Sequence, residues 1–150
     1  MKYDDASWHY GGDFPDDLPD EAGATHAGMF IAWVILSGNV GEELEEILEE
    51  NELKKITERE MTPGQFFLSF CDGKFTDSDV SEEIHGFIDT YFDFENGSYL
   101  TDYEEKLGQG LPSLYYIPDT WESYDVISPV IDKRFKEWKN PSPSWKFWKK

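Results

Sequence analysis

Residues 27–36 read AGMFIAWVIL and are apolar on nearly every face of a helix. A helix of that kind is buried in a protein core. We therefore predict a central buried helix over residues 23–38, with Thr25 as its N-cap and Gly38 as its stop. The apolar stretch is about half as long as a helix that crosses a bilayer, so we expect no membrane span.

The segment after this helix carries a second helical pattern. Residues 41–51, GEELEEILEEN, place Leu44, Ile47 and Leu48 on one narrow apolar stripe. Glutamates occupy the rest of that surface and predict a solvated face. The apolar pattern resumes after a break near Asn51.

Further helices follow, and Pro, Gly and N-cap signals bound them. Helix starts are indicated at Thr62-Pro63, at Asp77 or Ser78 and at Asp119 or Thr120, and helix ends at Asp72-Gly73 and Gly108. At Ser128-Pro129 the last helix is expected to restart or kink. The chain shows no convincing alternation of apolar and polar residues, so no strand is predicted.

The first 22 residues, MKYDDASWHYGGDFPDDLPDEA, form an acidic leader. Gly11-Gly12, Pro15 and Pro19 forbid a long helix there. The leader also holds four aromatic residues, which is too many for a free tail. We predict an irregular segment that docks its aromatic side chains on the body and leaves its aspartates outside.

These patterns together predict an all-α or mainly α fold. The expected architecture is a compact single-domain bundle of about five to seven helices, with an irregular N-terminal segment packed on it. The acidic helical domain is expected to cover residues 1–139, of which residues 1–22 are the docked leader. Residues 140–150, NPSPSWKFWKK, are expected to form a basic aromatic tail.

The chain is strongly acidic, with 13 basic and 32 acidic residues and a formal net charge of -19. Residues 132–150 hold seven of the basic residues and two of the acidic ones, so the part before them carries a charge of -24. Such a surface repels nucleic acid and anionic lipid, and we expect neither nucleic acid nor a membrane as a partner. The expected partner is a basic protein, although a domain that is merely soluble would have the same composition.

The chain has one cysteine, Cys71, so it cannot form an internal disulfide. No signal-peptide pattern follows Met1, and the expected compartment is the cytoplasm. Cys71 precedes Asp72 at a predicted helix C-terminus, where the helix dipole and the carboxylate raise the pKa of a thiol. A small buried thiol is expected there rather than a nucleophile.

No motif predicts catalysis. His9, His26 and His85 lie far apart and match no metal or phosphate-binding spacing, and each is expected to be a histidine at the edge of the core. The leader aspartates could bind a hard cation, and His9 with Asp4 or Asp5 is then the first pair to test. We expect no catalytic residue, no metal and no cofactor. The alternative is a metal-dependent enzyme that uses His9 and the leader aspartates.

Surface recognition is the function that these patterns favour. The leader and residues 110–118 are irregular segments rich in aromatic and acidic residues, and loops often carry function. The expected partner-binding residues are Trp8, Asp13, Asp16, Asp17, Tyr115, Tyr116, Trp121 and Glu122. The acidic faces of residues 13–21 and 42–52 also suit a basic partner. For Trp8 and Trp121, the alternative is that they lock the leader onto the body.

The opening string KYDDASWHYGGDFPDDLPDEAGATHAGMFIAW, residues 2–33, resembles a family of small, uncharacterised, acidic bacterial proteins that begin with nearly these residues. The resemblance continues through TPGQFF, CDGKFTDSD, YLTDYE, LPSLYYIPDTWESYD and FKEW, and covers residues 2–138. The family brings no established activity with it. By analogy in size and charge, such domains resemble immunity proteins, which neutralise a toxin delivered by a neighbouring cell.

We therefore expect a non-catalytic, protein-binding domain, in particular an immunity protein that covers the substrate-binding cleft of a cognate bacterial toxin. Toxin domains that attack nucleic acid or nucleotides tend to present cationic clefts, which a rigid acidic domain can fill. A housekeeping adaptor without a toxin partner is the other binding role that the sequence allows.

Overall fold

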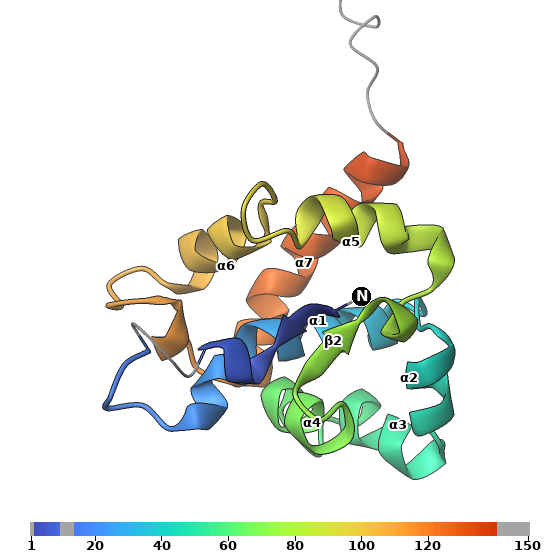
Figure 1. Cartoon of the computed structure of the whole chain (residues 1–150), viewed down its shortest axis with the longest axis horizontal. Helices are drawn as coiled ribbons and strands as arrows, with labels where there is room; N and C mark the ends of the chain where they lie inside the picture. The colour runs from blue at the N-terminus through green and yellow to red at the C-terminus, as the bar shows by residue number, and fades with distance from the viewer. Residues whose placement is uncertain (1, 10–13, 141–150) are drawn as a thin grey trace, which may run out of the picture.

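The structure, a computed structural model, describes residues 2–9 and 14–140. Over these residues the chain folds into seven α-helices, five short 3-10 turns and a two-stranded antiparallel sheet (Figure 1). The helices are α1 (Thr25–Leu36), α2 (Glu42–Ile47), α3 (Glu50–Thr57), α4 (Pro63–Phe70), α5 (His85–Tyr91), α6 (Tyr99–Leu107) and α7 (Trp121–Lys139). The strands are β1 (Lys2–Asp5) and β2 (Lys74–Thr76), and the 3-10 turns are η1 (Ala6–His9), η2 (Asp20–Ala24), η3 (Asp77–Asp79), η4 (Glu82–Ile84) and η5 (Leu114–Tyr116). The predicted mainly α fold is confirmed.

Helix α1 lies at the centre, and every residue from Thr25 to Ile35 is buried. The other helices surround it, and α4 and α7 pack directly against it (Figure 1). The contact with α4 depends on Gly28, because a Cβ there would lie 2.7 Å from the Pro63 carbonyl oxygen and 2.8 Å from Gly64 Cα. In the part of the chain that the structure describes, no helix has the length and apolarity to span a membrane.

Two predicted boundaries near α1 need correction. Thr25 is not the N-cap, because η2 leads straight into α1 and Thr25 is buried in the first helical turn. The break in the glutamate-rich helix comes before Asn51, since α2 ends at Ile47 and α3 begins at Glu50. Gly38, with φ of 77°, follows α1 in the left-handed conformation of a helix stop, as predicted.

The predicted start of α4 is confirmed and has an additional partner. Thr62 and Gln65 form a capping box, in which each side chain accepts the other residue's backbone N–H. The Asp119 carboxylate also accepts the Thr62 hydroxyl at 2.6 Å and the Gly64 N–H at 2.8 Å. The chain before α7 is thereby fixed to the start of α4. Helix α7 is one element through Pro129, so it does not restart there.

The sheet was not predicted, and it gives regular structure to the first part of the leader. Strand β1 pairs antiparallel with β2, with Asp4 opposite Phe75 and Asp5 opposite Lys74. Phe75 is fully buried, and its ring lies 5.0 Å from that of Tyr3. Each strand has three or four residues, which is too short to display alternation.

The helix predicted from Asp77 or Ser78 begins later than expected. Residues 77–79 form the 3-10 turn η3, and Val80 is extended and bridges to Val40. Helical structure resumes with η4 and continues into α5. The bridge brings the start of α2 next to the segment before α5.

Candidate functional site

Three chemically active side chains converge beneath the N-terminal segment. Asp4 comes from β1, His9 from the end of η1 and His26 from the first turn of α1. The Asp4 Oδ1 atom lies 2.8 Å from His9 Nε2, and its Oδ2 atom lies 2.7 Å from His26 Nε2. One potential ligand atom from each residue lies within 4.8 Å of the other two. We call this group the His–Asp–His cluster.

The surrounding structure holds each member of the cluster. Asp4 and His26 are fully buried, whereas the His9 side chain is 13% exposed. The Asp5 backbone N–H donates to Asp4 Oδ1 at 2.8 Å, and the Tyr115 hydroxyl lies 2.7 Å from His9 Nδ1. The cluster therefore ties β1, η1, α1 and η5 together.

Hydrogen bonding keeps the Asp4 carboxyl ionised. Burial alone would raise the pKa of Asp4, but the hydrogen bonds from His26 and His9 outweigh it and lower that pKa well below its usual value. In neutral imidazoles this arrangement places the proton on Nε2 of each histidine, so His9 Nδ1 accepts from the Tyr115 hydroxyl. Among the residues described, none hydrogen-bonds His26 Nδ1.

The structure brings together one pair that the sequence singled out, His9 with Asp4. The Asp5 carboxylate takes no part, because it accepts hydrogen bonds from Lys2 Nζ and Ser7 instead. His26 was expected at the edge of the core but is fully buried and is the third member. The sequence does contain a signal for this role, because His26 is a polar residue near the start of an otherwise apolar helix. A buried polar group needs a hydrogen-bond partner, so this position could have indicated that His26 pairs with another side chain.

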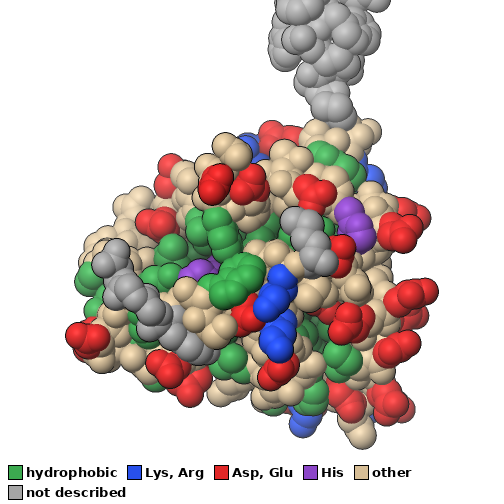
Figure 2. All heavy atoms as spheres, in the orientation of Figure 1, with side chains coloured by type: hydrophobic (Ala, Val, Ile, Leu, Met, Phe, Trp, Pro, Cys, Tyr) green, Lys and Arg blue, Asp and Glu red, His purple; other side chains and the backbone are tan. Residues whose placement is uncertain are grey.

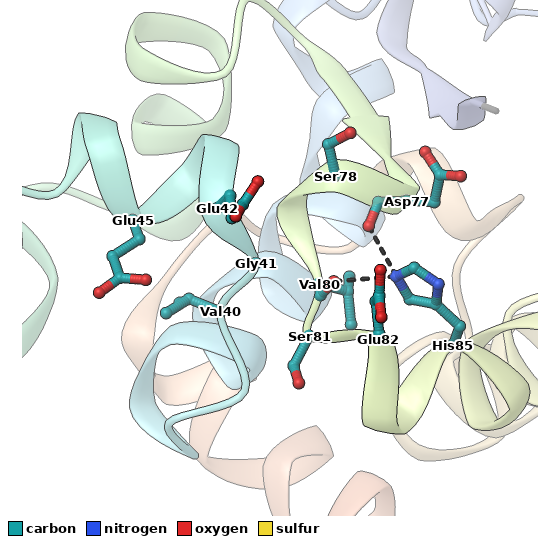
Figure 3. A pocket seen from close by; sticks show the side chains of 10 residues that line it. All are labelled: Val40, Gly41, Glu42, Glu45, Asp77, Ser78, Val80, Ser81, Glu82 and His85. Carbon is teal, nitrogen blue, oxygen red and sulfur yellow. Dashed lines mark hydrogen bonds between the residues drawn. The ribbon is translucent and has the colours of Figure 1, made fainter.

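A second candidate site is a surface pocket of about 490 Å³ beside α2 (Figure 3). Its lining contains four acidic residues and one histidine but no lysine or arginine. The lining residues are Val40, Gly41, Glu42, Glu45, Asp77, Ser78, Val80, Ser81, Glu82 and His85. We call it the acidic pocket.

Backbone contacts between two segments build the acidic pocket. Gly41 N–H donates to the Asp79 carbonyl, and Ser81 N–H donates to the Asn39 carbonyl, both at 2.9 Å. A Cβ on Gly41 would lie 2.7 Å from the Val80 carbonyl oxygen, so only glycine permits this approach.

The two sides of the acidic pocket carry carboxylates from different elements. Glu42 and Glu45 lie on the α2 side, and Glu82 lies across the gap from them (Figure 3). His85 Nε2 is fixed by the carbonyls of Asp77 at 2.8 Å and Val80 at 2.9 Å, so this nitrogen donates its proton to the backbone.

Acidic side chains gather along the edge of the molecule that α2 and α3 form (Figure 2). Helix α2 has three glutamates in its first turn, and Glu42, Glu45 and Glu82 are exposed. Lys54 and Lys55 of α3 offset part of this charge, but the edge keeps an excess of carboxylates, and the acidic pocket is its concave part.

The predicted partner-binding residues fall into two groups. The first lies at the end of the molecule opposite α2, where the leader meets η5 (Figure 1). Tyr116 donates to Asp17 Oδ1 at 2.6 Å, and Tyr115 packs 5.0 Å from Phe14. Asp16 and Asp17 are exposed. Asp13 lies outside the described residues.

Trp8 also belongs to the leader, but within the described residues its exposure argues against the alternative that it locks the leader onto the body. The residue is 53% exposed, and Lys2 Nζ lies 5.4 Å from the centroid of its ring. The contacts of Tyr3 and His9 hold this part of the leader instead.

Trp121 and Glu122 form the second group, at the start of α7. Trp121 is half-buried, donates its indole N–H to the Met61 carbonyl at 2.9 Å and stacks beneath Arg59. It fixes α7 to the segment before α4 rather than to the leader. Glu122 is exposed beside it.

The pKa of the Cys71 thiol is raised, as predicted, but the residue is half-buried rather than buried and the main cause differs. Burial raises the pKa of the thiol, and the carboxylates of Asp79 and Glu43 raise it further. A thiol that stays protonated is a poor nucleophile.

The fold and its two sites define a class: a small, acidic, mainly α domain whose N-terminal strand completes a buried His–Asp–His cluster. The family model "Domain of unknown function (DUF7832)" matches residues 2–117, well over half of the chain, and the chain belongs to that family. The match includes both the cluster and the acidic pocket, whereas α7 lies beyond it. Searches of the curated proteins and of the solved structures gave no significant match.

Proposed function

We propose that this chain is a non-catalytic binding domain for a basic protein, and that the partner is a bacterial toxin domain whose substrate-binding cleft it covers. The observation that carries the proposal is the acidic pocket, with carboxylates on two facing elements and no lysine or arginine in its lining. The net charge of -19 extends this attraction over the whole molecule.

The acidic pocket suits a lysine or arginine side chain of the partner. Glu42 and Glu45 on one side and Glu82 on the other could pair with a cation that enters between them, and charge-assisted hydrogen bonds are stronger than neutral ones. The negative edge around the acidic pocket would speed the encounter with a basic surface. The Gly41 contacts hold the two sides in place before the partner arrives.

The test is a pull-down with the tagged full chain from the cells that carry its gene, at low and then high salt, with mass spectrometry of the retained proteins. The informative variant is Glu42→Gln/Glu45→Gln. Its matched control is Glu104→Gln/Glu105→Gln, which removes two charges that are also exposed from α6. We expect one basic, toxin-like protein at near-equal stoichiometry, released by high salt, lost in the α2 variant and kept in the control.

Other outcomes contradict the proposal. If only housekeeping proteins are retained, the result favours an adaptor and excludes a toxin as the partner. If Glu42→Gln/Glu45→Gln and the control variant retain equal amounts of the partner, the acidic pocket is excluded as the binding site. In that case the Trp8→Ala and Tyr116→Ala variants test the predicted surface at the leader end.

A further inference from the structure

We propose that Asp4, His9 and His26 form a binding site for a divalent transition-metal ion of the zinc class. This inference does not depend on the proposed toxin partner. It rests on three donor side chains from separate elements that meet in the protein interior, within 4.8 Å of one another.

The donor set selects the kind of ion. Two imidazole nitrogens and one carboxylate oxygen suit Zn²⁺ and related transition ions. Mg²⁺ and Ca²⁺ take oxygen ligands, so a site with two histidines disfavours them. Three protein ligands leave a fourth tetrahedral position for water or another small ligand.

The spacing is close to that of a coordinated ion. Ligand atoms about 2.0–2.1 Å from a tetrahedral zinc lie about 3.3 Å from one another. Asp4 Oδ1 lies 2.8 Å from His9 Nε2, and Asp4 Oδ2 lies 2.7 Å from His26 Nε2, so these two pairs need to open by about 0.5 Å. One ligand atom from each of the three residues lies within 4.8 Å of the other two. His9 can move to open its own pair, because it ends a short 3-10 turn and is partly exposed. The Asp4–His26 pair has to open through a small rotation of one of these two buried side chains.

The outer contacts also fit coordination. When Nε2 binds a metal, the imidazole proton moves to Nδ1, and an outer partner then accepts it. For His9 that partner is present, since the Tyr115 hydroxyl lies 2.7 Å from Nδ1. The Asp5 N–H orients the Asp4 carboxylate in the same way. His26 Nδ1 has no partner within the described ranges, but an unpaired N–H costs far less than a coordination bond contributes.

The ion would act as a staple. Its ligands come from β1, η1 and α1, so coordination fixes the N-terminal segment to the central helix. Because the unfolded chain does not hold these three residues together, metal binding would add directly to folding stability.

The test uses the full chain with an affinity tag that contains no histidine. Metal content is measured by mass spectrometry after purification without chelator, and Zn²⁺ binding to the chelator-treated protein is measured by calorimetry. The variants are His9→Gln and Tyr115→Phe, and His85→Gln is the matched control, because that imidazole bonds only backbone carbonyls in the structure. Far-UV circular dichroism checks that each variant is folded.

We expect one Zn²⁺ per chain, a higher melting temperature with added Zn²⁺, and Co²⁺ binding with visible absorption bands. His9→Gln should weaken Zn²⁺ binding at least 100-fold, and Tyr115→Phe should weaken it about tenfold. His85→Gln should bind as the wild type does. The proposal is overturned if the wild type binds neither Zn²⁺ nor Co²⁺, or if His9→Gln, still folded, binds as tightly as the control.

Discussion

Asp79 is a buried carboxyl with acidic neighbours, and its titration has a measurable effect on stability. Only 4% of its surface is exposed. Burial raises its pKa to about 6, Glu43 and Asp77 raise it too, and the hydrogen bond from the Thr76 N–H opposes them. The folded state therefore binds a proton more tightly than the unfolded state does between about pH 4 and pH 6, so ionisation above that range destabilises the fold.

We predict that Asp79→Asn stabilises the protein by about 1 kcal/mol at pH 7.5, because it removes the buried charge but keeps an acceptor for Thr76. Urea unfolding of both proteins at several pH values measures this difference. The difference should grow as the pH rises from 4 to 6, stay constant above that range and vanish below pH 4. A constant difference across the whole range would contradict the assigned pKa.

Residue chemistry was only partly predictable for the His–Asp–His cluster. His9 and Asp4 are five positions apart in an acidic segment, so the sequence suggested that pair. His26 is separated from Asp4 by 22 positions, and only the pairing of β1 with β2 and the packing of η1 against η2 bring it near. No local pattern encodes a contact of that kind.

At the scale of elements, the crossing of α1 and α4 depends on a small residue, Gly28. Gly28 faces the first turn of α4, where a side chain would meet the backbone of Pro63 and Gly64. Gly64 in turn faces the Asp119 carboxylate. Backbone atoms at the end of a helix cannot move aside as a flexible side chain can, so this crossing tolerates no added atom.

We predict that Gly28→Ala destabilises the protein by about 3 kcal/mol, through overpacking against α4. The control is Gly38→Ala, where no atom lies within 4 Å of the added Cβ and only the positive φ is unfavourable. That change should cost about 1 kcal/mol. Thermal unfolding measures the loss of stability in both variants. Equal losses would show that α1 and α4 can move apart to accommodate the added Cβ.

The sequence predicted elements well where local chemistry defines them. Helix α1 has a continuous apolar pattern, α4 begins at the Thr62 cap, and α6 ends at Gly108. Each of these signals lies within the helix or directly beside it. Strands β1 and β2 lack such signals, because their identity comes from pairing with each other. The same applies to η3, where the bridge between Val80 and Val40 overrides the helical pattern.

At the scale of the whole molecule, α7 belongs to the core although the family match ends before it. Ile127 and Ile131 are fully buried, and the Trp33 indole N–H donates to Asp132 Oδ1 at 2.7 Å. Arg134 also forms two hydrogen bonds of 2.9 Å with Asp102 in α6. Removal of α7 would expose one side of α1 to water.

We predict that a chain ending at residue 117 does not fold cooperatively. Burial of each large aliphatic side chain contributes about 1.5–3 kcal/mol, and the loss of several would exceed the margin of a typical domain. The measurement is thermal unfolding followed by near-UV circular dichroism, with a chain ending at residue 140 as the control. A sharp transition in the shorter chain would refute the prediction.

The acidic surface also sets the response of the whole protein to salt. Like charges on α2 and on residues 77–82 repel one another across the acidic pocket. We predict that the melting temperature rises by several degrees from ~20 mM to ~500 mM NaCl, because salt screens this repulsion. The melting temperature of Glu42→Gln/Glu45→Gln should rise less with salt than that of Glu104→Gln/Glu105→Gln. Equal increases in the two variants would mean that the repulsion is not concentrated at the acidic pocket.

The pairing of β1 with β2 has a consequence for biosynthesis. The ribosome makes β1 about seventy residues before its partner strand, so the nascent segment waits, unpaired, while α1 to α4 emerge. Asp4 can meet His26 before β2 is available, and one side of the hydrophobic helix α1 stays uncovered until α7 leaves the exit tunnel. Chaperones that bind apolar nascent chains would therefore have their longest opportunity at α1, during translation of residues 37–139.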